Sequence, residues 1–327
     1  MKKNKMRLLA GALAVTLLLG GCRIGGKEIV ITGGLGSQDV CKIGGTSCKL
    51  TEARVYLANY QNIYGKSYGI DLWEQNFQRE ELTKYIKEIA LSQMSKVVCM
   101  DLLAKERGIT LSGEEKKEIR AAAAEYYQSL TDAELDYTKA SESDIVSMYE
   151  DYVLADKVYR SLTKGVDAEV SDDEARIMEA MQIFVKGRKK SKEVEKKLKE
   201  GEDFAAVASN YNMKPEIEIT FGRGVLPKEV EEAAFELENE EISDGIKTED
   251  GFYFIKCINK FNEALTDDNK SNIVAAREKA AFDDVYEEFV SGLSSKLNEE
   301  VWDDVTLLTD GSIRTDSFFQ VIEDAMD

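Results

Sequence analysis

Apolar residues recur at helical spacing along most of the chain and at strand spacing in only a few short stretches. A wide apolar stripe predicts a helix over residues 80–107, and a second stripe predicts another over residues 271–298. Ser112 with Glu115, and Thr131 with Glu134, stand at the spacing of a capping box, which marks two further helix starts. Residues 39–170 are therefore expected to be mostly helical.

Strand patterns are confined to three places. Residues 40–49 contain Gly44-Gly45 between two short runs, which predicts a hairpin with a two-residue turn. Residues 180–185 are apolar at nearly every position, as in a central strand covered on both faces. Residues 251–257 form a last β-run, and three short helices are predicted between it and residue 185.

The amino terminus predicts the compartment. Residues 1–7 carry four positive charges, residues 8–19 are apolar, and Leu19-Gly20-Gly21-Cys22 follows, which is the pattern of a lipoprotein signal peptide. We expect residues 1–21 to be removed and Cys22 to be lipidated at the outer face of a bacterial cell membrane. Residues 22–38 would then form a flexible tether. The alternative is an uncleaved signal anchor with an incidental cysteine.

Charge and composition exclude several classes of function. The chain has 62 acidic and 43 basic residues and a net charge of −19, and loss of the basic signal peptide makes the mature chain still more acidic. Such a surface repels phosphate backbones, so no nucleic-acid partner is expected. The sequence contains no histidine. Zinc sites and histidine-dependent nucleophilic catalysis are therefore excluded, and we expect no metal and no cofactor.

Four cysteines remain after Cys22. A two-residue turn at Gly44-Gly45 would place Cys41 opposite Cys48, and outside the cell such a pair could form a disulfide. The register makes it a hydrogen-bonded pair with the wider Cα separation, so the pairing stays open. Cys99 and Cys257 lie in apolar runs and are expected to be core thiols.

The segment from residue 191 to residue 256 resembles the parvulin family of peptidyl-prolyl isomerases. It contains a Gly201-to-Phe204 spacing between two helices, a Gly-rich turn, an Ala233-Ala234-Phe235 helix end, and Glu241–Gly251, which reads as the family's E-[VI]-S-x-x-[VI]-K-T-x-x-G. The order and spacing of these pieces carry the resemblance.

The polar positions of the family's active site differ in this chain. Gln182 stands for the histidine of the first family strand and Tyr253 for the histidine of the last one, and Glu218 is the nearest acid to the family's Asp or Cys. These three are the candidate catalytic positions. The resemblance places the substrate-binding residues at Leu226, Val230, Phe235 and Phe221.

Around this segment the chain resembles PrsA-type foldase lipoproteins and SurA-like chaperones. The resemblance implies an N-terminal helical chaperone segment at residues 39–170, a parvulin-like domain at 171–262, and C-terminal helices at 263–327 that complete the helical lobe. The expected fold is α+β: a mostly helical lobe with an inserted domain in which helices flank a small antiparallel sheet.

The resemblance implies a membrane-anchored foldase that assists the folding of secreted proteins and isomerises X–Pro bonds. Its partners would be unfolded or partly folded secreted polypeptides, and whether it forms a homodimer stays open. Isomerisation requires no nucleophile, because a dry apolar pocket can favour the twisted state over the planar imide. The alternative is a chaperone whose parvulin-like domain binds clients without catalysis. A solute-binding lipoprotein is a third option, but the long helical runs argue against it.

Overall fold

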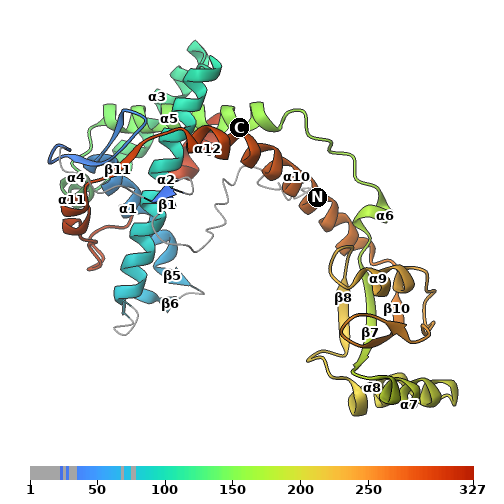
Figure 1. Ribbon diagram of the computed structural model, residues 1–327. Helices are drawn as coiled ribbons and strands as arrows, with labels where there is room; N and C mark the ends of the chain where they lie inside the picture. Colours follow the sequence, from blue (N-terminus) through green and yellow to red (C-terminus); the bar gives the residue numbers. More distant parts are fainter. Residues whose placement is uncertain (1–22, 25–26, 29–34, 68–69, 75–78) are drawn as a thin grey trace, which may run out of the picture. The chain divides into compact units, whose positions relative to one another are not determined.

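A computed structural model of the chain describes residues 23–24, 27–28, 35–67, 70–74 and 79–327. Cys22 and the expected signal peptide lie outside the described residues. The chain forms two compact units: unit 1 combines the residues up to Lys164 with Phe282–Asp327, and unit 2 comprises Gly165–Ala281 (Figure 1). Unit 2 is longer than the predicted domain at 171–262 because the first part of helix α10 packs with it. Asn269 on α10, for example, donates a hydrogen bond to the carbonyl oxygen of Ala175 over 2.8 Å.

Unit 1 is mostly helical. Its helices are α1 (Leu50–Tyr64), α2 (Arg79–Arg107), α3 (Gly113–Ser129), α4 (Asp132–Thr138), α5 (Glu142–Thr163), the last part of α10 (Glu263–Ser291), α11 (Glu299–Asp304) and α12 (Phe318–Met326). Shorter elements are β1 (Arg23–Ile24), β2 (Lys27–Glu28), β5 (Lys66–Ser67), β6 (Ile70–Asp71) and the 3-10 turn η1 (Leu72–Glu74). The predicted starts of α3 and α4 are confirmed, because Ser112 and Thr131 each form a complete capping box.

The predicted hairpin is also confirmed, and it belongs to a three-stranded sheet in unit 1. Strands β3 (Asp39–Ile43) and β4 (Thr46–Lys49) meet at Gly44 and Gly45, whose φ angles of 54° and 93° suit glycine. Strand β11 (Ser295–Leu297) pairs with the other edge of β3. Cys41 lies opposite Cys48, and both thiols are buried and free.

The C-terminal residues complete the core of unit 1. Phe318 on α12 is fully buried, and its carbonyl oxygen accepts a hydrogen bond from the Tyr149 hydroxyl over 2.7 Å. Its backbone N–H donates to the buried Asn59 over 2.9 Å. Helix α12 is thereby fixed against helices from the first half of the chain.

Unit 2 is built on an antiparallel sheet in the order β8-β7-β10-β9. The strands are β7 (Met178–Val185), β8 (Glu218–Phe221), β9 (Ile246–Lys247) and β10 (Phe252–Asn259), and the helices are α6 (Asp172–Ala175), α7 (Arg188–Lys199), α8 (Phe204–Tyr211), α9 (Lys228–Phe235) and the first part of α10. Strand β7 is central, as its apolar sequence predicts. Helices α7 and α8 pack on one face of the sheet, and α9 packs on the other.

A close backbone approach explains one glycine of the Glu241–Gly251 motif. A Cβ atom at Gly251 would lie 2.5 Å from the carbonyl oxygen of Val185 and 2.8 Å from the Phe184 ring. Only glycine therefore lets strand β10 start beside the end of β7.

Candidate functional site

The candidate site lies on the sheet face that α9 covers. Phe184 on β7 is opposite Tyr253 on β10, and Gln182 is opposite Ile255, so all four side chains project to the same face. The Phe184 and Tyr253 rings are 4.7 Å apart between centroids. Gln182 and Tyr253 are both buried. The structure thus brings together the two positions where the parvulin pattern has histidines.

The predicted substrate-binding residues gather on this same face. Val230 and Phe235 come from α9, and Phe221 ends strand β8 with its ring 5.6 Å from that of Phe235. Leu226 precedes α9 and is half-buried against the cluster.

Glu231 fixes the turn that carries Leu226. One of its carboxylate oxygens accepts hydrogen bonds from the backbone N–H groups of Val225, over 2.9 Å, and Leu226, over 3.3 Å. The side chain of Val225 is 65% exposed beside it. The apolar turn is therefore held by a carboxylate that reaches back from the first turns of α9.

Glu218, the predicted catalytic acid, is not part of this cluster. Along β8, Ile219 and Phe221 project to the face with Gln182 and Tyr253, so the intervening positions project away from it. Glu218 pairs with Met181, which packs on the opposite face, and its side chain is exposed. The expectation that Glu218 joins the polar centre is therefore wrong, because strand alternation turns it away.

Gln182 serves as a backbone clamp. Its side-chain amide donates a hydrogen bond to the carbonyl oxygen of Glu216 over 3.1 Å, and its backbone N–H donates to that of Ile217 over 2.8 Å. These bonds tie the segment between α8 and β8, residues 212–217, to strand β7. We call this segment the 212–217 loop.

The 212–217 loop also brings Lys214 to the site, which sequence reasoning missed. The Lys214 ammonium nitrogen lies 5.1 Å from the centroid of the Phe184 ring and 5.9 Å from that of Tyr253. Both distances are within the range of a cation–π interaction. The sequence signal was weak: a lysine before a proline in a polar loop has many ordinary explanations.

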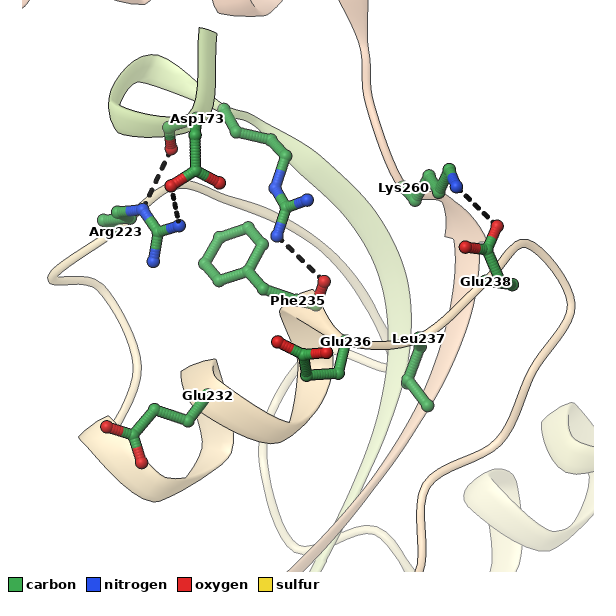
Figure 2. Close-up of a pocket in the computed structure, with 9 residues that line it drawn as sticks. Asp173, Arg223, Glu232, Phe235, Glu236, Leu237, Glu238 and Lys260 are labelled. Carbon is green, nitrogen blue, oxygen red and sulfur yellow. Dashed lines mark hydrogen bonds and ion pairs between the residues drawn. The ribbon is translucent and has the colours of Figure 1, made fainter. Parts of the chain in front are cut away.

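A cavity of about 450 Å³ lies at the C-terminal end of α9 (Figure 2). It is lined by Asp173, Arg176, Arg223, Glu232, Phe235, Glu236, Leu237, Glu238 and Lys260. Most of these side chains are charged, and Arg223 is paired with Asp173 over 2.6 Å. Of the seven predicted catalytic and substrate-binding residues, only Phe235 lines this cavity.

Two guanidinium groups cover the Phe235 ring. The guanidinium carbon of Arg176 lies 4.4 Å from the ring centroid, and that of Arg223 lies 4.8 Å from it. Arg176 also donates a hydrogen bond to the carbonyl oxygen of Phe235 over 2.9 Å. Phe235 therefore contacts the apolar cluster on one side and the charged cavity on the other.

Within the described part of the chain, no group of three or more cysteine, aspartate or glutamate side chains is placed to hold a metal ion.

The chain is similar to known proteins over most of its described length. Residues 156–269 match the family of PPIC-type PPIASE domains, and this range contains every predicted catalytic and substrate-binding residue. Foldase protein PrsA of Caldanaerobacter subterraneus is 26% identical over 254 residues, which cover 66% of this chain and 78% of that protein. Foldase protein PrsA 4 of Bacillus cereus is 33% identical over 113 residues, which cover 33% of this chain and 40% of that protein.

Among solved structures, the peptidylprolyl isomerase PrsA from Bacillus cereus is 23% identical, with a TM-score of 0.37 and coverage of 81% of this chain and 99% of that one. The matched domain and the curated relatives point to the same group of proteins. Residues 156–269, most of which lie in unit 2, match the family of PPIC-type PPIASE domains, and the chain is similar to PrsA foldases over about two thirds of its length.

Proposed function

We propose that this chain is an extracytoplasmic foldase that is anchored to the membrane, assists the folding of secreted proteins, and isomerises X–Pro bonds in unit 2. The observation that carries the proposal is the apolar cluster of Leu226, Val230 and Phe221 beside Tyr253, inside the range that matches the PPIC-type domain. Its clients would be unfolded or partly folded polypeptides that present proline.

The proposed chemistry is rotation about a peptide C–N bond. Its barrier of about 18–20 kcal/mol arises from lost amide resonance, so no covalent step is needed. Leu226 and Val230 would hold the proline ring and keep water from the imide, and the twisted state would be bound more tightly than the planar one. Tyr253 and Phe184, which are buried, would form an aromatic floor beneath this surface.

Two observations favour a second candidate, a chaperone whose unit 2 binds without isomerising. The Gln182 amide is engaged with the Glu216 carbonyl, so it does not reproduce the role of a free polar group in the pocket. The guanidinium groups of Arg176 and Arg223 cover the ring of Phe235. A client could still dock on the remaining apolar surface without being twisted.

Unit 1 would supply general affinity for unfolded segments. Ile63, Tyr64 and Tyr85 are each about two-fifths exposed, and the rings of Tyr64 and Tyr85 lie 5.8 Å apart. Exposed apolar side chains that are grouped in this way support contact with apolar client segments.

The proposed lipid at Cys22 would hold the protein at the membrane. No helix in the described part of the chain is long and apolar enough to span a bilayer.

The test is cis-to-trans isomerisation of proline peptides with purified protein, comparing Leu226→Ala with the matched control Val225→Ala. Leu226 packs on the cluster, whereas the neighbouring Val225 is 65% exposed. We expect acceleration that falls about tenfold in Leu226→Ala and stays within about twofold in Val225→Ala, because the half-buried Leu226 is proposed to hold the proline ring whereas the exposed Val225 does not pack on the cluster.

Aggregation of an unfolded client, measured in parallel, separates the two candidates. If no peptide is accelerated but aggregation is suppressed, the second candidate holds. If neither activity is present, the assignment as a foldase is wrong.

A further inference from the structure

The 212–217 loop is held in one position on the sheet by bonds from both of its ends. Asn212 accepts a hydrogen bond from the backbone N–H of Phe184 over 2.9 Å and donates one to the carbonyl oxygen of Glu216 over 3.0 Å. The backbone N–H of Met213 donates to the Phe184 carbonyl over 2.9 Å. Together with the clamp from Gln182, these bonds fix the backbone on either side of Lys214.

The backbone at Lys214 is therefore held in a fixed position beside the sheet. It is exposed, yet its ammonium group lies above the rings of Phe184 and Tyr253. No carboxylate among the described residues comes within 4.0 Å of it, whereas other lysines of unit 2, such as Lys256 and Lys260, are paired with glutamates. A cation in this position can still take an anionic partner.

We propose that Lys214 selects clients with an acidic side chain next to the proline. This inference rests on the proposed role of the α9 face as the proline site. Leu226 packs against the cluster that contains Phe184 and Tyr253, and Lys214 lies over those two rings, so a Glu or Asp next to a proline at Leu226 would lie on the same sheet face as the ammonium group.

A structural role for the lysine would have a different signature. The aliphatic part of Lys214 could serve only to cover the two rings, because long charged side chains often bury their stems on apolar surface. Lys214→Met keeps a flexible apolar side chain and removes the charge, and Lys214→Glu reverses the charge. A purely structural role predicts that Lys214→Met leaves the order of peptide affinities unchanged.

The experiment measures binding of labelled peptides to the full chain by fluorescence anisotropy. The peptides carry Glu, Leu or Lys before proline, and a second set carries the same residues after proline. The proteins are the unsubstituted chain, Lys214→Met, Lys214→Glu and the control Lys192→Met. Lys192 is exposed on α7, which packs on the opposite face of the sheet.

In one of the two peptide sets, with the residue either before or after proline, we expect the unsubstituted chain to bind the Glu peptide about two- to fivefold more tightly than the Leu peptide. This is the range for a solvent-accessible ion pair. The preference should vanish in Lys214→Met, reverse toward Lys peptides in Lys214→Glu, persist in Lys192→Met, and weaken in high salt. The same order of affinities in Lys214→Met as in the unsubstituted chain overturns the proposal, as does an absence of binding to every peptide.

Isomerisation rates of the same peptides keep this proposal distinct from the isomerase assignment. Charge-dependent binding without acceleration upholds the role of Lys214 and refutes catalysis. Acceleration without any charge preference refutes the role of Lys214 and upholds catalysis.

Discussion

A buried aspartate in unit 1 gives the chain a pH-dependent stability that can be worked out from the structure. Asp151 on α5 is largely enclosed, and burial is the main reason that its pKa is raised from 3.8 to about 7. The negative charges of Asp101 on α2 and Glu52 on α1 raise the pKa further, and Lys105 opposes them. Asp101 is itself paired with Lys105 over 2.5 Å, which limits what that lysine can offer Asp151.

The direction of the pH dependence of stability follows from the raised pKa of Asp151. The folded state holds the proton more tightly than the unfolded chain, so Asp151 costs no stability below its usual pKa of 3.8. The cost grows as pH rises and is complete above about 7. Each pKa unit corresponds to about 1.4 kcal/mol, so the full cost is on the order of 4 kcal/mol as an upper bound. Asp151→Asn should therefore raise the free energy of unfolding by about 2–4 kcal/mol at pH 8 and leave it nearly unchanged at pH 4.

Tryptophan fluorescence makes the assay specific for unit 1. The chain has two tryptophans, and both Trp73 and Trp302 are buried in unit 1. Urea unfolding of Asp151→Asn and of the unsubstituted chain at pH values from 4 to 8 gives the difference in stability, in which the contributions of groups that do not interact with Asp151 largely cancel. The exposed Glu287→Gln on α10 is the control and should show no such trend. A difference that is absent, or that does not grow with pH, refutes the reasoning.

Two further substitutions test other parts of the structure. Gly251→Ala should destabilise unit 2 by about 1–3 kcal/mol through overpacking against Val185 and Phe184, seen as faster amide hydrogen exchange in β7 and β10 while tryptophan fluorescence is unaffected; unchanged exchange would show that the close approach is relieved. For Glu134, burial raises the pKa, but hydrogen bonds from the backbone N–H groups of Thr131, Arg314 and Thr315 outweigh it and leave the pKa lowered. Its stabilisation is thus present above its usual pKa and lost as pH falls through the lower folded value, so Glu134→Gln should cost about 1–3 kcal/mol at pH 7 and progressively less in acid, by the same fluorescence assay; a cost that does not change with pH would contradict this.

Most helices were predictable because their signals are local, but the helix expected over residues 271–298 spans Glu263–Ser291 instead, and Ser295–Leu297 form strand β11. Ser112 and Thr131 cap the residues that directly follow them, and the apolar stripe of residues 80–107 matches α2 within one residue. The hairpin at Gly44-Gly45 was predictable because its two-residue turn needs positive φ angles, which glycine adopts readily. The role of Phe318 was not predictable, because its burial depends on Tyr149 and Asn59, more than a hundred residues away in sequence.

The residues of the site differ in the same way in how far local sequence signals could place them. Gln182 and Tyr253 lie on one sheet face because the register of β7 and β10 pairs Gln182 with Ile255 and Phe184 with Tyr253. Glu218 could not be placed, since the side to which a short edge strand turns a residue depends on its register with β7. Lys214 could not be placed either, because the position of its loop depends on bonds from Asn212 and Gln182 to partners elsewhere in the unit.

Gln182 connects the loop to the sheet and gives a reason to test binding and catalysis separately in this chain. A side-chain amide that donates to the Glu216 carbonyl stabilises the 212–217 loop, and that loop presents Lys214 over the aromatic floor. The position where the parvulin pattern has a histidine therefore holds the 212–217 loop in this chain. A change at Gln182 would first disturb how a client is oriented and selected, whereas a change at Leu226 would first disturb how the proline ring is held. The proposed selection by charge and the proposed rotation of the imide would thus depend on different residues of one sheet face, so the loss of one would not require the loss of the other.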